Sequence, residues 1–174
     1  MEFWEVIHAR RSVRQFRQDK PVKEAQVEKL LEAAIRAPSA GNRQPWHFYV
    51  VWSQDVKDGL AAAAFDQTFV AEAPVVIVVC ADAARSAARY GSRGRELYCI
   101  QDTAIATTHI LLAAVDMGLG ACWVGAFDEE QAAAVLRLPA VLRPVAIVPV
   151  GHPAKEGGAR TPRRSMQEVV TVVK

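Results

Sequence analysis

Arg10, Ser12 and Arg14 lie close together near the N-terminus, within the stretch RRSVRQF at residues 10–16. A guanidinium forms a planar, charge-assisted fork that matches a phosphate, so Arg10 is a candidate phosphate ligand. Arg14 could then reach another part of the same molecule, with Ser12 adding a neutral hydrogen bond. The alternative is that the arginines end a helix in solvent, where they complement its dipole. Their spacing alone leaves both interpretations open.

A second candidate binding segment is APSAGNRQPW, residues 37–46. Ser39 and Asn42 offer hydrogen-bond donors, and the small Ala40 and Gly41 let the backbone approach a flat ligand. Proline, serine, glycine and asparagine are also common turn formers, so a plain helix-to-strand loop is the alternative. Ten residues is long for such a connection, and its small polar groups are dense, which favours a binding loop.

The charge of the chain limits its partners. It carries 21 basic and 19 acidic residues, a net charge of +2, which argues against bulk affinity for nucleic acid or an anionic membrane. The arginines are not interleaved with stacking aromatic residues, so a nucleic-acid-binding domain is the weakest interpretation. Basic residues do cluster at both ends of the chain, which suits one compact anion. The clustered residues are Arg10, Arg11, Arg14, Arg17, Arg160, Arg163 and Arg164.

The cysteines, histidines and apolar runs favour a cytoplasmic protein. Cys80, Cys99 and Cys122 show no CxxC spacing, so we expect reduced thiols that serve as packing residues, and no metal site. His109 should be a core histidine with a satisfied hydrogen bond. No apolar run approaches the ~20 residues that cross a bilayer, and the first residues lack the order of a secretion signal. We therefore expect no membrane partner.

Helices and strands must position these side chains. A short helix opens the chain at Phe3. Amphipathic spacing and a capping box of Asp128 with Gln131 predict four more helices. They cover residues 21–37, 54–64, 96–117 and a stretch ending near 138. Apolar, β-branched runs predict strands. They cover residues 46–52, 75–80, 121–124 and 145–150, with a β-rich tail over 169–173.

The order of these elements predicts a single domain over residues 1–174, of class α/β or α+β, with one mixed sheet. The strand over 75–80 is continuously apolar, so both of its faces should be covered. The long helix should bury one stripe of side chains. We expect that stripe at Ile100, Ala104, Thr107, Leu111 and Ala114.

Several segments, in order along the chain, resemble one family of flavoproteins. The stretch RRSVRQF, followed about two dozen residues later by APSAGNRQPWHFYVV, is similar to the signature of the nitroreductase family. The segments FVAEAPVVIVVCAD, GLGACWVGAF and GHPA with PRRSMQEVV resemble its central strand, its loop at the flavin edge and its C-terminal end. The resemblance runs from Val6 to Val170. It implies a three-layer α+β fold with a mixed, mainly antiparallel sheet in an intertwined homodimer.

The resemblance also implies non-covalently bound FMN in sites shared between two subunits. It places the FMN phosphate on Arg10 and Arg163, with Arg164 as the competing choice, and the cation facing flavin N1 and O2 at Arg14. The loop that contains Pro38, Ser39, Ala40 and Asn42 would come from the other subunit and cover the same flavin. The backbone at Val124 and Gly125 would lie near flavin N5. The implied cofactor-binding residues are Arg10, Arg11, Ser12, Arg14, Pro38, Ser39, Ala40, Asn42, Gln67, Val124, Gly125, Arg163 and Arg164.

The activity implied is hydride transfer from NADH or NADPH, through flavin N5, to a nitroaromatic, quinone or similar planar electron-poor acceptor, in a ping-pong cycle. Arg14 acts electrostatically in this scheme, and no side chain serves as an acid or base. Larger members of the family carry a lid where this chain has only Ala81–Arg95. Two alternatives stay open: an FMN enzyme of the same fold acting on a dedicated metabolite by dehydrogenation, dehalogenation or flavin fragmentation, and a non-catalytic flavin-binding protein.

Overall fold

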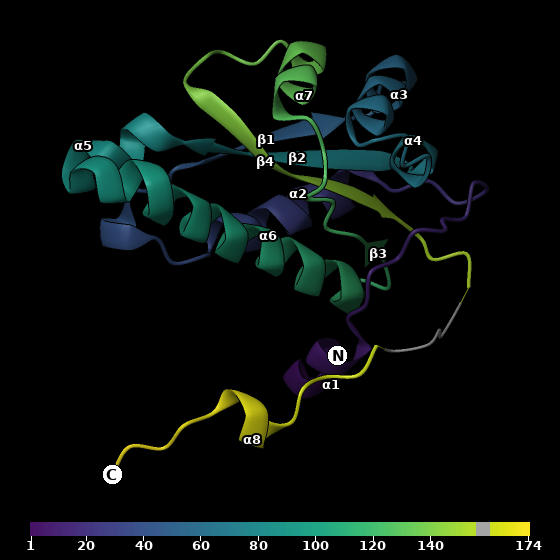
Figure 1. Ribbon diagram of the computed structural model, residues 1–174. Coiled ribbons are helices and arrows are strands. Elements are labelled where there is room, and N and C mark those ends of the chain that lie inside the picture. Colours follow the sequence, from purple (N-terminus) through teal and green to yellow (C-terminus); the bar gives the residue numbers. More distant parts are fainter. Residues whose placement is uncertain (156–160) are drawn as a thin grey trace.

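The computed structural model describes residues 1–155 and 161–174, and Figure 1 shows how their elements are arranged. The predicted basic residue Arg160 lies outside the described residues. The helices are α1 (Phe3–Ala9), α2 (Glu24–Ile35), α3 (Gln54–Ala63), α4 (Phe69–Glu72), α5 (Ala83–Arg93), α6 (Cys99–Asp116), α7 (Glu129–Leu136) and α8 (Met166–Val169), with a 3-10 turn at Ala40–Asn42 and a π-helical turn at Gly94–Tyr98. The strands are β1 (Trp46–Val51), β2 (Val75–Asp82), β3 (Gly120–Ala121) and β4 (Leu142–Gly151).

The four strands form one sheet in the order β1-β2-β4-β3, and each neighbouring pair is antiparallel. The predicted α+β class is confirmed. The prediction of a mixed sheet needs correction, because within the described residues parallel pairing occurs only at the isolated bridge between Ser12 and Ala121.

The central strand β2 is buried on both faces, as its apolar run predicted. Val76, Val78 and Cys80 pack with α3, α4 and α7, whereas Val75, Ile77 and Val79 pack with α2 and α6. Successive side chains of a strand point to opposite faces, so one strand contributes to two cores. The result is three layers, with helices above and below the sheet (Figure 1).

The buried face of α6 differs from the predicted stripe. Thr107 and Ala114 are buried as predicted, whereas Ile100, Ala104 and Leu111 are only half-buried, so the prediction is correct in part. Thr103, which was not predicted, is also buried. The hydroxyls of the two threonines can be buried because they donate to carbonyls one turn back: Thr103 to Cys99 (2.8 Å) and Thr107 to Thr103 (2.8 Å). The buried residues of α6 are Cys99, Asp102, Thr103, Ala106, Thr107, Ile110 and Ala114.

Two predicted strands are corrected as well. The strand expected over 121–124 is only Gly120–Ala121, and Val124 rejoins the sheet through a single bridge to Ile147. The tail expected to be β-rich begins with the short helix α8, because Ser165 and Glu168 form a capping box at its start. Residues 170–174 have no regular structure.

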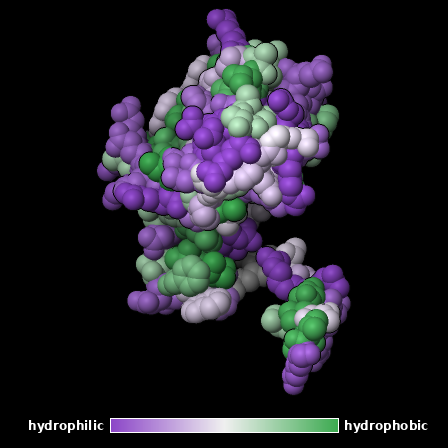
Figure 2. All heavy atoms as spheres, turned by 90° about the vertical axis from the view of Figure 1, so that its left-hand side faces the viewer, coloured by the Kyte–Doolittle hydropathy of each residue, from purple (hydrophilic) through white to green (hydrophobic). Residues whose placement is uncertain are grey.

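The C-terminal tail stands apart from the body of the protein, and its side chains are exposed (Figure 1). Figure 2 shows apolar side chains on this separate segment. They belong to Met166, Val169, Val170, Val172 and Val173.

The segment Ala81–Arg95, whose role the sequence left open, is mostly helix α5, and Asp82 caps it by accepting a hydrogen bond from the Arg85 N–H (2.9 Å). Among the described residues, no helix combines the length and the apolar character needed to cross a membrane.

Candidate active site

The N-terminal arginine segment runs along the edge of the sheet beside β3. The Val13 N–H donates to the Ala121 carbonyl (3.0 Å), and the Arg17 N–H donates to the His152 carbonyl (2.8 Å). The approach is close because two glycines face it: a Cβ added at Gly120 would lie 2.7 Å from Val13. A Cβ at Gly151 would lie 2.7 Å from the Phe16 ring. The two backbones therefore hold residues 10–17 in a fixed register.

Arg10, Ser12 and Arg14 gather around one buried thiol, that of Cys122. Burial raises the pKa of this thiol, and the charges of Arg14 and Arg10, together with a hydrogen bond from Ser12, act in the opposite direction. Among the described residues neither Arg10 nor Arg14 forms an ion pair with a carboxylate. The segment thus presents two guanidiniums whose charge no carboxylate of the described residues neutralises.

The Arg14 side chain extends toward a second group of predicted residues. Its guanidinium carbon lies 5.8 Å from the centroid of the Phe69 ring, a cation–π contact. Two residues before Phe69, the Gln67 amide donates to the carbonyls of Ala64 (2.9 Å) and Ala126 (3.2 Å). The Gln67 amide is therefore tied to the stretch that follows β3.

Of the two backbone positions predicted near flavin N5, only one is free to meet a ligand. The Val124 N–H donates to Ile147 and its carbonyl accepts from Ile147 (2.9 and 3.0 Å). The Gly125 N–H has no hydrogen-bond partner among the described residues. The next residue, Ala126, receives the Gln67 bond. Gly125 is thus the backbone donor that this stretch leaves open to solvent.

The loop around Ser39–Asn42 is held in shape by its own polar groups. The Gln44 N–H donates to the Ser39 hydroxyl oxygen (3.0 Å), and the Gln44 amide donates to the Asn42 side-chain oxygen (3.0 Å). Gly41 and Asn42 have positive φ angles of 53° and 54°, a conformation that glycine and asparagine tolerate best. The Ala40 N–H donates to the Asp102 carboxylate in α6 (3.1 Å). The Ser39 hydroxyl hydrogen and the Asn42 amide hydrogens stay available as donors.

The structure does not bring this loop to the arginine segment of the same chain. The loop is attached at Asp102, in the first turn of α6, whereas Ser12 pairs with Ala121, beyond the last turn of that helix. The helix rises 1.5 Å per residue, so Asp102 and Asp116 are about 21 Å apart along its axis. Figure 1 shows the loop beneath α5 and the N-terminal segment at the opposite end of α6.

The remaining predicted arginines lie elsewhere. Arg11 donates to the Lys155 carbonyl (3.0 Å), which ties the segment after β4 to the N-terminal segment. Arg163 donates to Thr161 (3.0 Å), and Arg164 donates to the Glu168 carbonyl (2.9 Å). Both are exposed and bond within the projecting tail, and no hydrogen bond of the described residues joins either to Arg10.

Comparison with known proteins decides the family. The sequence model of the nitroreductase family matches residues 7–71 and 63–152, which together are most of the chain. The chain belongs to the nitroreductase family. The predicted membership of that family, and with it the prediction of an enzyme, is confirmed.

Several nitroreductase-family relatives resemble this chain over most of its length. An NADH dehydrogenase of Thermus thermophilus is 36% identical over 175 residues, covering 85% of each chain. An FMN reductase [NAD(P)H] of Bacillus subtilis is 28% identical, covering 91% of this chain and 68% of the relative. The crystal structure of a nitroreductase family protein from Clostridium novyi NT superposes with a TM-score of 0.80 at 35% identity, covering 97% and 91%.

Two residues of this nitroreductase-family site were missed from the sequence. Phe69 was assigned no role, although an aromatic residue two positions after Gln67 follows the same turn. Asp102 is only 4% exposed, one of its oxygens accepts the Ala40 N–H, and the other has no partner among the described residues. Burial raises the pKa of this carboxyl. An acidic residue one turn from the buried Cys99 and Ala106 was the available signal.

The cysteine and histidine predictions agree with the structure. Cys80, Cys99 and Cys122 are free and buried. Burial raises the pKa of Cys80 to about 12, so its thiol stays protonated at neutral pH. The His109 ring nitrogen Nδ1 lies 2.9 Å from the Ala33 carbonyl, which joins α6 to α2. His109 is half-buried and has its hydrogen bond.

Proposed function

We propose that this protein is an FMN-dependent oxidoreductase that takes reducing equivalents from NADH or NADPH and delivers them to planar electron-poor acceptors such as nitroaromatics and quinones. The observation that carries the proposal is that Arg10, Ser12 and Arg14 lie near Cys122 at the edge of the sheet, with the Arg14 guanidinium in contact with Phe69, two residues after Gln67. Family membership and the names of the relatives, an NADH dehydrogenase and an FMN reductase [NAD(P)H], support it.

The chemical types of the polar groups in this cluster, and their order along the chain, match the parts of an FMN molecule. Arg10 is half-buried and carries no ion pair among the described residues, so its guanidinium can meet a phosphate. Each charge-assisted hydrogen bond to a phosphate contributes about 1.5–3 kcal/mol. Ser12 would bond the ribityl or pyrimidine side. Both amide hydrogens of Gln67 are already used, so its side-chain oxygen would accept a hydrogen bond from the ring. Pro38, Ser39, Ala40 and Asn42 would meet the same flavin from the other subunit.

FMN, when bound, supplies the redox chemistry by accepting hydride from the nicotinamide and passing electrons to the acceptor in a ping-pong cycle. The chain binds, polarises and shields the ring. Arg14 would place a positive charge beside the edge of the pyrimidine where negative charge develops. The cation–π contact with Phe69 would help to hold the Arg14 guanidinium in position. The Gly125 N–H would meet the ring near N5, and no side chain needs to act as a proton donor or acceptor.

The proposed site needs two copies of the chain. Within one chain the loop at Ser39 and the cluster at Arg14 lie at opposite ends of α6. Apolar side chains that a partner could cover are exposed on α1, where Phe3 and Trp4 are 65% and 67% exposed, and on the tail. Large exposed apolar patches mark association surfaces. We therefore propose a homodimer in which the tail brings Arg163, or Arg164, to the FMN phosphate of a shared site.

The test is anaerobic reduction of the FMN-loaded protein. The flavin absorbance should bleach with NADH or NADPH and return when menadione or nitrobenzene is added. A control variant, Arg36→Ala, changes an exposed arginine that directly follows α2, outside the cluster, and should behave as the parent. A protein that binds FMN but stays oxidised with both nicotinamides would favour a dedicated metabolite as substrate. Failure to bind FMN, or a monomer in sedimentation analysis, would contradict the proposal.

A further inference from the structure

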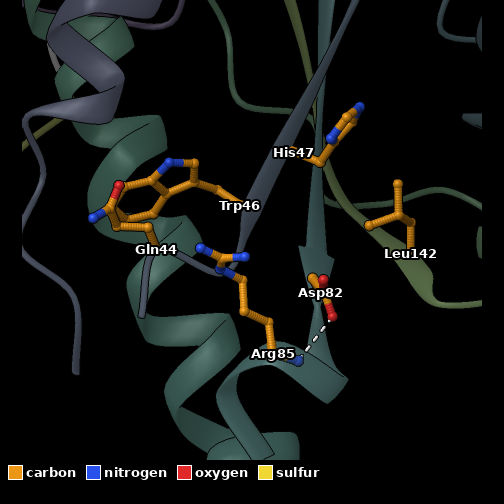
Figure 3. A pocket seen from close by; sticks show the side chains of 6 residues that line it. All are labelled: Gln44, Trp46, His47, Asp82, Arg85 and Leu142. Atoms are coloured by element: carbon orange, nitrogen blue, oxygen red, sulfur yellow. Dashed lines mark hydrogen bonds between the residues drawn. The ribbon is translucent and has the colours of Figure 1, made fainter. Parts of the chain in front are cut away.

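A polar cavity of about 310 Å³ lies at the edge of the sheet where β1 begins, β2 ends and β4 begins (Figure 3). It is lined by Gln44, Trp46, His47, Asp82, Arg85 and Leu142. The register explains how these residues meet, since Trp46 pairs with Ala81 and Asp82 pairs with Leu142. Leu142 and Gly151 are the two ends of β4, about 30 Å apart at 3.4 Å per residue. The cavity is therefore remote from the Arg10–Arg14 cluster of its own chain.

The guanidinium of the lining residue Arg85 is held in place by hydrogen bonds exchanged with its neighbour Arg43, which does not itself line the cavity. The Arg85 Nε donates to the Arg43 carbonyl (2.6 Å), and the Arg43 Nε donates to the Arg85 carbonyl (3.1 Å). Neither arginine takes part in an ion pair among the described residues, and no hydrogen bond there uses their Nη groups. The Nη groups of a guanidinium held in this way are free to bind an anion.

Within this mostly polar lining, the indole of Trp46 adds one flat apolar surface beside the charge of Arg85. Figure 3 shows the Arg85 guanidinium directed toward Trp46 and Gln44. The only acidic lining residue is Asp82, and it already accepts the Arg85 N–H as the cap of α5. An indole favours a planar ring against its face, while the guanidinium favours a carboxylate or phosphate at the edge of that ring.

We propose that this cavity is a binding site for a compact aromatic anion, a planar ring bearing a carboxylate or a phosphate. Its volume is at the lower end of the range for small-molecule sites, which limits the ligand to about the size of a mononucleotide. Binding at this site would depend on the lining residues alone and would not require FMN. Gln44 lines the cavity and also bonds Asn42 and Ser39, so an occupant would contact the loop proposed to cover the flavin.

The experiment titrates the purified dimer or monomer, as it occurs, with benzoate, AMP or inorganic phosphate, and follows tryptophan fluorescence and calorimetric heat. Benzoate or AMP should bind saturably at millimolar concentrations or below, and inorganic phosphate at least tenfold more weakly. Benzoate and AMP distinguish a carboxylate ligand from a nucleotide. Arg85→Met should weaken binding tenfold or more, and Trp46→Phe should weaken it severalfold. The matched control is Arg89→Met, one turn along α5 and outside the lining, which should bind as the parent does.

Three results would overturn the proposal. One is the absence of saturable binding by either aromatic anion, and another is equal affinity for inorganic phosphate, which would leave the ring without a role. The third is binding that Arg14→Ala abolishes and Arg85→Met leaves intact, because the ligand would then occupy the N-terminal cluster. A protein that fails to bind FMN could still bind the aromatic anion in this cavity, so the two proposals can be refuted independently.

Discussion

Gly120→Ala is the sharpest test of how the sheet positions the arginine segment. A Cβ at residue 120 would lie 2.7 Å from both Cβ and Cγ2 of Val13. Carbon atoms pack best at about 3.5–4.0 Å, so Val13 must retreat by about 1 Å. Val13 stands between Ser12 and Arg14, and its N–H bonds the Ala121 carbonyl. The retreat therefore displaces both neighbouring side chains together.

The expected cost has two parts. Overpacking of a buried contact lowers the free energy of unfolding by about 1–3 kcal/mol. For a chain of this size, each kcal/mol lowers Tm by about 2–4 °C. A misplacement of about 1 Å can cost a rate factor of about 10² at a reacting centre. We expect the FMN dissociation constant to rise about tenfold or more and the rate of flavin reduction to fall by a larger factor.

The assay pairs calorimetry with fluorescence titration of FMN and anaerobic stopped-flow reduction. Gly59→Ala is the matched control, since its added Cβ would lie 3.0 Å from Val135 on the face that α3 shares with α7. That variant should keep the FMN affinity of the parent whatever its Tm. If Gly120→Ala bound and reduced FMN like the parent, the close approach of Gly120 and Val13 would not be what positions Ser12 and Arg14.

Three further predictions concern single residues. Arg14→Ala should slow flavin reduction more than it weakens FMN binding, because we propose that Arg14 meets the ring and not the phosphate; equal reduction rates in stopped-flow would contradict its electrostatic role. Arg163→Ala should raise the FMN dissociation constant measured by titration, and if Arg164→Ala alone does so, the two arginines exchange roles. Burial raises the pKa of Asp102 above its ordinary 3.8, so the folded protein holds this proton more tightly than the unfolded chain. The parent should therefore lose stability as pH rises from about 3.8 through that raised pKa, whereas Asp102→Asn should lack this loss. Urea denaturation of both proteins across pH measures the difference. Identical stability profiles for the two proteins would refute the assignment to Asp102.

Local patterns were sufficient where neighbouring residues decide the structure. The apolar run at Val75–Cys80 predicted a strand covered on both faces, and Asp128 with Gln131 predicted the start of α7, where the Gln131 N–H donates to Asp128 (2.9 Å). These predictions rest on burial and capping, which act within a few residues. The stripe on α6 was correct at Thr107 and Ala114 but missed Thr103, Ala106 and Ile110, because burial there depends on contacts with α2 and the sheet.

The family, the α+β class and the residue types able to hold a phosphorylated flat ring could be inferred from the sequence, since they follow from the order and chemistry of motifs such as RRSVRQF. Which of those residues lie together depends on the tertiary structure. Arg10, Ser12 and Arg14 lie near Cys122, and Arg14 reaches Phe69, because Gly120 lets the first segment reach the sheet. The loop at Ser39 stays at the far end of α6, held by Asp102. Contacts between residues distant in the chain depend on packing and backbone spacing, which no local pattern contains.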